Sequence, residues 1–463
     1  MKNFLTLASV CAIALASCNK DTVTPTGDFN AGLPSKPQKH VPVDADGLIT
    51  QNFLSKDTVW LIDGISFVSP GQTLEIEAGT YLTTGNTKAY VHNGVTNNIA
   101  GVLVVPKTAK IDAEGTAAEP IVFTSPKASG RAAGDFGGLV LLGQAPTNRT
   151  TPPVIEGIPQ PIGVDVTYGG NISADDSGIL KYVRIEFAGY NLTPDNEING
   201  LTLGGVGSGT VLSHIQVSWG RDDAFEFFGG TVNADHLVAL STDDDDFDFD
   251  FGYTGTIEYA LSLKDPNSTN STSGGSSDSN GLESDNDGTG SAASPKTQPT
   301  LKNFTFLGIN NSTTAATKLK FGNRWRRATA MTITRSIIAG YGTGVSFESI
   351  TAPISTFSNN VVHGYTTAIT GTPTPANYTG NGTSTAAVAN TYLKLGNALG
   401  SVNPFYATST AGSFSVANLV PANGSPAANA SGTTNTYKGA FAPGTTAASA
   451  WTAGWTQFAP TTY

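Results

Sequence analysis

The chain has 463 residues, of which only 13% are charged, whereas 53 are glycine and 25 are proline. Residues that favour helices are scarce, and Thr, Ser, Gly, Asn and Val are abundant, which is typical of strands and turns. A hydrophobic fraction of 39% is sufficient for a sizeable core. The formal net charge of -11 excludes an overall basic field, so we expect no nucleic-acid partner.

The first 17 residues have the features of a signal peptide. Lys2 precedes an apolar run, Phe4 to Ala16, that is too short to span a bilayer as a mature helix. The run ends in LASC (15–18), which resembles a bacterial lipobox and implies cleavage before Cys18 and lipidation of its thiol. No Asp follows Cys18, so we expect an outer-membrane lipoprotein, with the leaflet left open. An ordinary signal peptide with an incidental cysteine is the alternative.

Short strand-like segments recur between corners rich in Gly, Asn and Pro. Those beginning at residues 181, 213, 235, 258, 302, 335 and 359 follow one another at steps of 32, 22, 23, 44, 33 and 24 residues. One coil of a parallel β-helix needs roughly 20 to 30 residues. The longest step contains a low-complexity stretch, 264–299, which we expect to be a loop-like insertion. A β-sandwich or propeller is the alternative, but tight hairpin turns are scarce.

The segment GVLVVPKTAKIDAEGTAAEPIVFTS (101–125) resembles the opening coils of right-handed parallel β-helix proteins. From about residue 70 onward the chain is similar to a family of uncharacterised bacterial lipoproteins with this pectate-lyase-like fold. The motifs that carry this similarity include GDFGGLVLLGQAPTN (134–148), DDAFEFFGGTVNADHLVAL (222–240) and DDDDFDFDFGYTG (243–255). Some members carry a "multidrug transporter" label, which this sequence contradicts because no apolar run long enough for a span follows the signal peptide. The resemblance implies an all-β protein, a single right-handed parallel β-helix (solenoid) with N- and C-terminal caps.

The organisation expected along the chain has five parts. They are a lipoprotein signal peptide (1–17), a flexible tether (18–48), an N-terminal cap with the first coil (49–100), the β-helix (101–370) with its insertion, and the last coils with a C-terminal cap (371–463). The apolar segment 440–460 carries two of the five tryptophans. We expect it to pack over a coil edge, and a tryptophan platform for sugar stacking is the alternative.

An acidic stretch from Asp222 to Asp250 contains ten carboxylates and no Lys or Arg. Within it Phe247, Phe249 and Phe251 alternate with acidic residues, as a half-buried strand requires. Residues one coil apart stack at about 4.8 Å, and we expect this of Asp222 and Asp246. Carboxylates at that distance repel unless some are protonated or a cation lies between them.

Oxygen ligands of this kind suit Ca²⁺, and we predict a structural calcium site. Its candidate ligands are Asp222, Asp223, Glu226, Asp244, Asp246, Asp248, Asp250, Glu283, Asp285 and Asp287. A solvated acidic face is an equal alternative, and a ligand-binding or catalytic site is a further one.

A basic segment follows at KLKFGNRWRR (318–327). One interpretation assigns Arg324, Trp325, Arg326 and Arg327 to ligand binding, the arginines on carboxylates of an anionic glycan and the indole on a sugar face. The other, which the sequence favours, is that these arginines form ion pairs with the acidic residues. In pectate-lyase-like β-helices Asp-bound Ca²⁺ acidifies a uronate proton and an Arg is the base, but no specific lyase motif is present here.

Two functions therefore stay open. The first is a non-catalytic envelope lipoprotein, anchored in the membrane through Cys18, whose calcium-stabilised β-helix presents a binding or structural surface to a glycan or a protein. The second is a calcium-dependent polysaccharide lyase that acts on uronate-containing glycans. No catalytic residue is assigned. The five histidines occur singly, and His214 and His236 are expected to stack on successive coils in a structural role.

Overall fold

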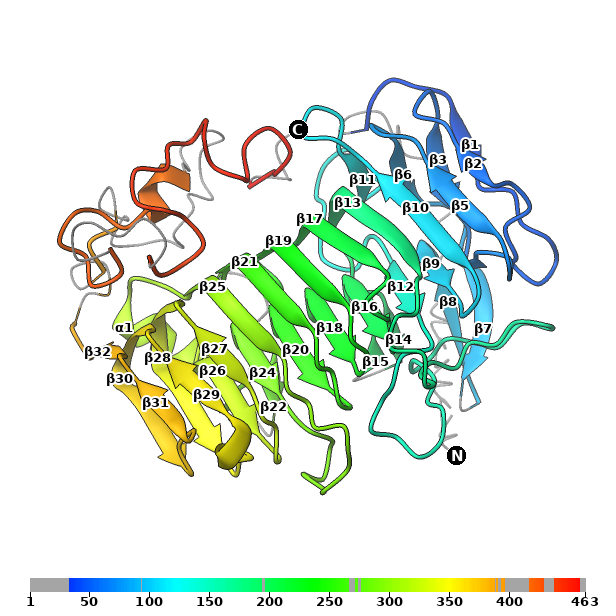
Figure 1. Ribbon diagram of the computed structural model, residues 1–463. Helices are drawn as coiled ribbons and strands as arrows, with labels where there is room; N and C mark the ends of the chain where they lie inside the picture. The colour runs from blue at the N-terminus through cyan, green and yellow to red at the C-terminus, as the bar shows by residue number, and fades with distance from the viewer. Residues whose placement is uncertain are drawn as a thin grey trace, which may run out of the picture.

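The structure, a computed structural model, describes residues 33–92, 94–193, 196–265, 271–273, 276–387, 389, 393–395, 416–428 and 437–458. One 26-stranded sheet, in which every strand pairing is parallel, winds through most of these residues (Figure 1). The predicted fold class, a single right-handed parallel β-helix, is confirmed.

Three stacks of strands run along the solenoid, because each coil contributes one strand to each stack. The first stack consists of β2 (Phe53–Leu54), β5 (Thr73–Ile76), β10 (Lys110–Glu114), the first halves of β13 (Gly178–Glu186), β17 (Val211–Ser218), β19 (Asn233–Leu240), β21 (Thr256–Leu263) and β25 (Thr300–Leu307), and then β27 (Thr332–Thr334), β29 (Thr356–Ser358) and β31 (Asn377–Thr379).

The second stack begins with β1 (Gln38–His40), β3 (Val59–Ile62), β6 (Tyr81–Thr84) and β11 (Ile121–Thr124), continues through the second halves of β13 to β25, and ends with the first parts of β28 (Ile337–Glu348) and β30 (Val361–Thr372) and with β32 (Gly382–Ser384). The third stack comprises β4 (Ile65–Phe67), β9 (Val102–Val105), β12 (Gly138–Leu142), β16 (Leu201–Gly204), β18 (Phe225–Phe228), β20 (Phe247–Asp250), β24 (Leu282–Ser284), β26 (Phe321–Arg326) and the second parts of β28 and β30.

Small elements lie outside the main sheet. They are the antiparallel pairs β7 (Lys88–His92) with β8 (Val95–Ile99), β14 (Asn191–Thr193) with β15 (Asn196–Glu197) and β22 (Thr272–Ser273) with β23 (Ser276–Ser277), the helix α1 (Ser312–Lys318), and two 3₁₀ turns, η1 (Ala352–Ile354) and η2 (Val416–Leu419). None of the helices within the described ranges has the length and apolar character that crossing a membrane requires.

Inward side chains fill the solenoid in rows, one residue per coil. Phe225 and Phe247 stack with their ring centroids 5.2 Å apart, and Phe227 and Phe249 lie at 5.1 Å. These rings are fully buried, whereas the residues between them in β18 and β20 reach the outer face. The alternation follows from the two-residue repeat of a strand, and each buried ring contributes a few kcal/mol to the core.

The C-terminal segment covers a lateral face of the solenoid, not a coil edge as predicted. In the second stack the outward positions are also apolar, and Val238, Leu240 and Leu263 belong to a separate cluster that includes Phe441 and Trp455 of the tail. The amide of Gln216 donates to the carbonyl of Gln457 at 2.6 Å and accepts from its N–H at 2.8 Å. An apolar outer face needs a cover along its length, which explains where the tail lies (Figure 1).

Two expected boundaries differ in the structure. Strand β1 pairs with β3, so the part of the predicted tether from residue 38 onward already belongs to a coil. The expected insertion is not wholly a loop, because β24 lies between β20 and β26 and its Leu282 is fully buried. The signal peptide and Cys18 lie outside the described residues.

A carboxylate band with an arginine border

The outward positions of the third stack bring acidic and basic side chains into register. Glu226 of β18 pairs with Asp248 of β20, Asp248 pairs with Glu283 of β24, and Glu283 pairs with Arg324 of β26. Neighbouring strands in a sheet are about 4.8 Å apart. Three consecutive carboxylates and then a guanidinium therefore follow one another up the face of the solenoid.

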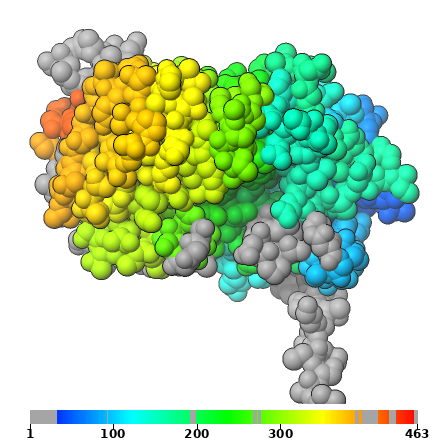
Figure 2. Space-filling model, turned by 90° about the horizontal axis from the view of Figure 1, so that it is seen from below, coloured from blue at the N-terminus to red at the C-terminus, as the bar shows by residue number. Residues whose placement is uncertain are grey.

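This face lies in a hollow. Figure 2 shows a recess over the green strands, near residues 200–250, between teal residues from the segment around 150–175 and light-green residues from the segment around 280–299. The walls of the recess are thus long connections between strands, and its floor is the third stack.

Seven carboxylates, which we call the carboxylate band, form a continuous cluster on the third stack and at the corner that precedes it. Within each of three groups, oxygen atoms from all three residues lie within 4.8 Å of one another. Two residues, Asp223 and Asp248, belong to two groups each and so connect them. The groups are Asp222, Asp223 and Asp244; Asp223, Glu226 and Asp248; and Asp245, Asp248 and Glu283.

The band is buried enough to change its protonation. Asp223, Asp245 and Glu283 are only 6%, 4% and 7% exposed. Burial, and after it the neighbouring carboxylates, raises the pKa of Asp223, Glu226, Asp245 and Asp248 well above the usual range. Burial also raises the pKa of Glu283 to about 8, although Arg326 opposes this.

One oxygen in the band is left without a partner. Among the described residues Asp248 Oδ1 is buried and has no hydrogen bond. A buried carboxylate oxygen in that state is costly unless a proton or a cation occupies it. The side chains grouped with it are all carboxylates, with no His or Cys among them, which is the chemistry of a hard cation such as Ca²⁺.

Two members of the band also take part in a ladder of hydrogen bonds at a corner of the solenoid. The N–H of Asp223 donates to Asn199 Oδ1 at 3.2 Å, and the N–H of Asp245 donates to Asp223 Oδ1 at 2.8 Å. The N–H of Asn280 then donates to Asp245 Oδ1 at 2.6 Å. Each step needs a single acceptor oxygen, which Asn supplies as well as Asp. The ladder therefore does not use the second carboxylate oxygen of Asp223 or of Asp245.

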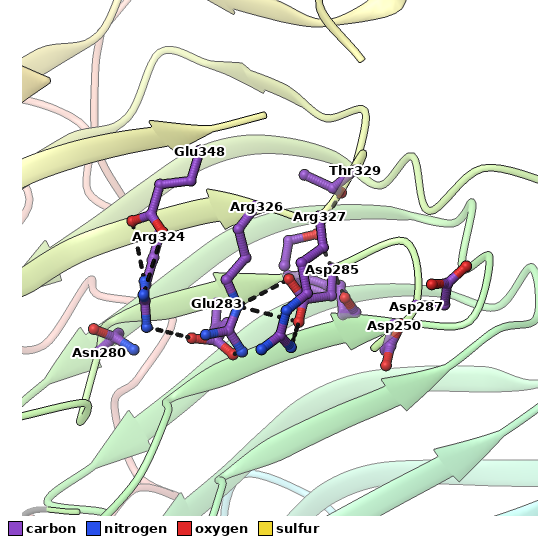
Figure 3. Close-up of polar contacts among 12 residues, drawn as sticks. Asp250, Asn280, Glu283, Asp285, Asp287, Arg324, Arg326, Arg327, Thr329 and Glu348 are labelled. Carbon is purple, nitrogen blue, oxygen red and sulfur yellow. Dashed lines mark hydrogen bonds and ion pairs between the residues drawn. The ribbon is translucent and has the colours of Figure 1, made fainter. Parts of the chain in front are cut away.

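Three arginines, Arg324, Arg326 and Arg327, form the border of the band toward the C-terminus (Figure 3). Arg324 lies 2.6 Å from Asp278 and donates to both oxygens of Glu348 at 3.1 and 3.2 Å. Arg326 lies 2.9 Å from Asp285 and also contacts Glu283.

Arg327 lies 2.6 Å from the second oxygen of Asp285. Burial opposes the charge of Arg326, but Glu283 and Asp285 raise its pKa above the usual value. These contacts are the ion pairs that the sequence favoured. The three arginines also line a pocket of about 420 Å³ together with Thr289, Gly290 and Glu348.

The structure corrects the expectation for Trp325. Its ring is fully buried and packs edge-to-face on Phe347 and Phe357, with centroids 5.1 and 5.7 Å apart. Because Arg324 and Arg326 point outward from β26, the residue between them points inward. The indole therefore cannot stack on a sugar.

Asp246 is also placed differently from the prediction. It is fully buried, 3.3 Å from Lys264, and accepts hydrogen bonds from Thr242 at 2.6 Å and Ser262 at 2.5 Å. The coil-to-coil offset here is 22 residues, since Glu226 pairs with Asp248, so Asp246 does not stack on Asp222.

The aromatic alternation ends earlier than expected. Phe251 has a left-handed backbone with φ of 50° and packs on Phe228, not with Phe249 in the core; both rings lie against an apolar cluster outside the solenoid that includes Val140 and Tyr168.

Three further candidate ligands lie beside the band and not in its groups. Asp285 is held by the arginine border, and Asp287 accepts hydrogen bonds from Thr289 and Ser291, which lower its pKa against the effect of burial. Asp250 lies near both, and burial raises its pKa to about 8. Two residues with a role here, Asp245 and Asn280, are absent from the predicted site. The 22-residue repeat that leads from Asp223 to Asp245 is the signal that locates the first, whereas Asn280 lies 35 residues beyond Asp245 and no such repeat locates it.

A parallel β-helix with a carboxylate-rich lateral groove is the class of protein that this geometry defines. The model of a family described as a pectate-lyase-like β-helix domain matches residues 47–456, and the chain belongs to that family. Comparisons with curated proteins and with solved structures find no match.

Proposed function

We propose that this chain is a calcium-binding β-helix protein of the cell envelope whose lateral groove is a binding surface and not a catalytic centre. The observation that supports this most directly is the continuous carboxylate band with its unpartnered buried oxygen on Asp248. Ca²⁺ takes six to eight oxygen ligands in loose geometry. Asp223, Glu226 and Asp248 supply the central ligands, and Asp245 and Glu283 extend the site toward the arginines.

The cation in this proposal has two effects. It neutralises carboxylates that burial disfavours in the charged form, and it binds the folded chain selectively, which stabilises the fold. It also gives the groove a positive centre beside the arginine border. The cation and the arginines can then both contact a ligand that carries hydroxyl or carboxylate groups. A glycan is one such ligand, and an acidic protein surface is another. The proposed lipid on Cys18 holds this surface at the outer membrane.

The runner-up is a calcium-dependent lyase that acts on uronate-containing glycans. The family membership and the position of the arginines next to the carboxylates favour it. A base, however, needs a pKa near the working pH, and the carboxylates around Arg326 raise its pKa instead. Arg324 and Arg327 are likewise ion-paired. We therefore prefer the non-catalytic function.

The test is a thermal melt of the mature chain in excess Ca²⁺ and in EDTA, on the wild type and on the double variant Asp223→Asn/Asp248→Asn. Selective binding at 100 times Kd stabilises by about 2.7 kcal/mol, so we expect a rise of several degrees in the wild type and little in the variant. The control Asp46→Asn/Glu75→Gln removes two exposed carboxylates elsewhere and keeps the full rise.

An equal calcium-dependent rise in the Asp223→Asn/Asp248→Asn variant contradicts the proposal. Release of unsaturated uronate products from pectate or alginate, measured by their ultraviolet absorbance with Ca²⁺ present, would instead establish the lyase. Loss of that release in Arg326→Gln would assign the base.

A further inference from the structure

A second cluster of ligating side chains lies at a different corner of the solenoid, between the first and second stacks. His214 in β17 and His236 in β19 occupy equivalent positions on successive coils, with left-handed φ values of 58° and 56°. Their rings are stacked, with centroids 4.3 Å apart and planes 16° from parallel. The tyrosines Tyr182 and Tyr259 continue the stack on both sides, at 4.5 and 5.3 Å.

A carboxylate lies beside the two stacked imidazoles. Asp235 pairs with Ser213 across the two coils, and its Oδ1 is 2.5 Å from His236 Nδ1 and 3.9 Å from His214 Nδ1. Ligand atoms of the two histidines and of Asp235 all lie within 4.8 Å of one another. The side chain of His214 is 17% exposed, that of His236 25% and that of Asp235 46%, so ions in solution reach them.

The chemistry of this cluster differs from that of the carboxylate band. Two imidazole nitrogens and one carboxylate oxygen favour borderline first-row divalent ions, whereas Ca²⁺ and Mg²⁺ prefer oxygen alone. We propose that His214, Asp235 and His236 form a site for a first-row transition ion such as Zn²⁺, with solvent in the remaining positions. Nothing in the proposed calcium function requires this site.

The surroundings fit binding at neutral pH. A metal-ligating imidazole must be neutral, and burial together with His236 lowers the pKa of His214 to about 4, although Asp235 opposes this. Lys181, whose charge also disfavours protonation of His214, is held by Glu114 at 2.7 Å.

Binding requires three local changes. Ser213 Oγ contacts His214 Nδ1 at 2.8 Å and donates to Asp235 Oδ1 at 2.6 Å, so it must turn away. The hydrogen bond of 2.5 Å between His236 Nδ1 and Asp235 Oδ1 must open to admit the ion, and the two rings must tilt toward a common point.

The tail supplies an internal reporter for this site. Trp451 lies edge-on to His236 with centroids 5.1 Å apart, and Trp455 lies edge-on to His214 at 5.7 Å. Paramagnetic Cu²⁺ bound by the histidines should therefore quench these two indoles among the five in the chain.

The test is calorimetric titration of Zn²⁺ into the full mature chain with Ca²⁺ at saturation, which occupies the oxygen-only site. We expect one Zn²⁺ per chain, and an affinity at least about tenfold lower in His214→Ala, His236→Ala and Asp235→Asn. The matched control is His40→Ala, which removes an exposed imidazole 2.7 Å from Asp63 and should leave the affinity unchanged. Ser213→Ala keeps all three ligands and removes the hydroxyl that engages both His214 Nδ1 and Asp235 Oδ1, so its affinity should equal or exceed that of the wild type.

Absence of Zn²⁺ uptake by the folded wild type overturns the proposal, as does an equal loss of affinity in His40→Ala. If a histidine variant does not fold, quenching by Cu²⁺ decides in its place. Quenching that falls in Trp451→Phe supports the site, and quenching that Trp451→Phe leaves unchanged contradicts it.

Discussion

Two corners of this solenoid carry the same kind of hydrogen-bond ladder, but only one of the two ladders contains charged residues. We call the corners uncharged and charged after the residues of their ladders. At one corner the N–H of Ser336 donates to Asn360 Oδ1 at 2.9 Å and the N–H of Asn360 donates to Asn381 Oδ1 at 3.0 Å. Both amides also donate, to the carbonyls of Ile333 and Phe357, at 3.1 and 2.8 Å. The asparagines thus satisfy a donor and an acceptor at each step.

At the other corner Asp223 and Asp245 occupy the steps between Asn199 and Asn280. An aspartate serves as the acceptor but has no amide to donate, and in a buried position it adds a charge that raises the cost of folding. Aspartate where asparagine is sufficient thus marks a position at which the ladder serves something besides the fold. In our proposal that purpose is to hold a cation.

The largest expected effect concerns pH in the absence of calcium. The pKa values of Glu283 and Asp250 in the folded chain are about 8, above those of about 4 in an unfolded chain. Groups whose folded pKa is raised stabilise the fold at low pH, and this stability falls as pH rises toward the folded pKa. In EDTA the free energy of unfolding should therefore fall between pH 5 and pH 8 by up to about 1.4 kcal/mol per pH unit for each group, and the melting temperature should fall with it.

In excess Ca²⁺ the same series should be shallower, because the cation replaces the proton of Glu283, whereas Asp250 lies outside the groups of the band and keeps its share of the slope. A melting temperature in EDTA that rises over this interval would show that the carboxylate band is charged and stable without a cation.

A smaller effect is expected at the uncharged corner. Asn360→Ala leaves the buried N–H of Ser336 and the carbonyl of Ile333 without their partner, which costs about 2 to 3 kcal/mol. The loss should be the same in Ca²⁺ and in EDTA, as measured by the midpoint of urea denaturation. A loss that Ca²⁺ repairs would remove the distinction between the two corners.

The smallest effect, but the most specific, concerns Asp245 at the charged corner, where one substitution should change the free energy of unfolding in opposite directions with and without Ca²⁺. Asp245→Asn keeps the acceptor for the N–H of Asn280 and removes one buried charge. We expect it to stabilise the chain on the order of 1 kcal/mol in EDTA and to destabilise it by a similar amount in Ca²⁺. Urea denaturation in both buffers measures the change, and the same sign in both would mean that Asp245 does not ligate a cation.

Much of the architecture was predictable because a solenoid repeats its signal in every coil. Strand-like segments, Gly corners and steps of about one coil predict the parallel β-helix independently of any one residue. Strand β24 was missed because Leu282 is the one large apolar residue in a polar, low-complexity stretch, and only its neighbours in space show that it belongs to the core.

Prediction of the site required the exact number of residues in each coil. The segments that begin at 213 and 235 are 22 residues apart, and the same offset pairs Glu226 with Asp248, whereas an offset of 24 led to Asp246. The alternation of side chains along a strand could by itself have placed Trp325 inside, because it lies between two arginines that point outward. The arginine pairs with Asp278 and Glu348 could not be predicted, since they join residues brought together only by the winding of the coils.

The C-terminal tail has a consequence for how the molecule unfolds. Stacked repeats contact only their neighbours, so their ends can fray coil by coil. Here one segment is attached at two distant places: the carbonyl of Gly439 accepts from Asn303, and the carbonyls of Trp455 and Gln457 accept from Arg184 and Gln216. A coil between these attachments cannot separate from its neighbours without also releasing the tail. The tail thus couples the coils along the solenoid, so that the coils between its two attachments unfold cooperatively.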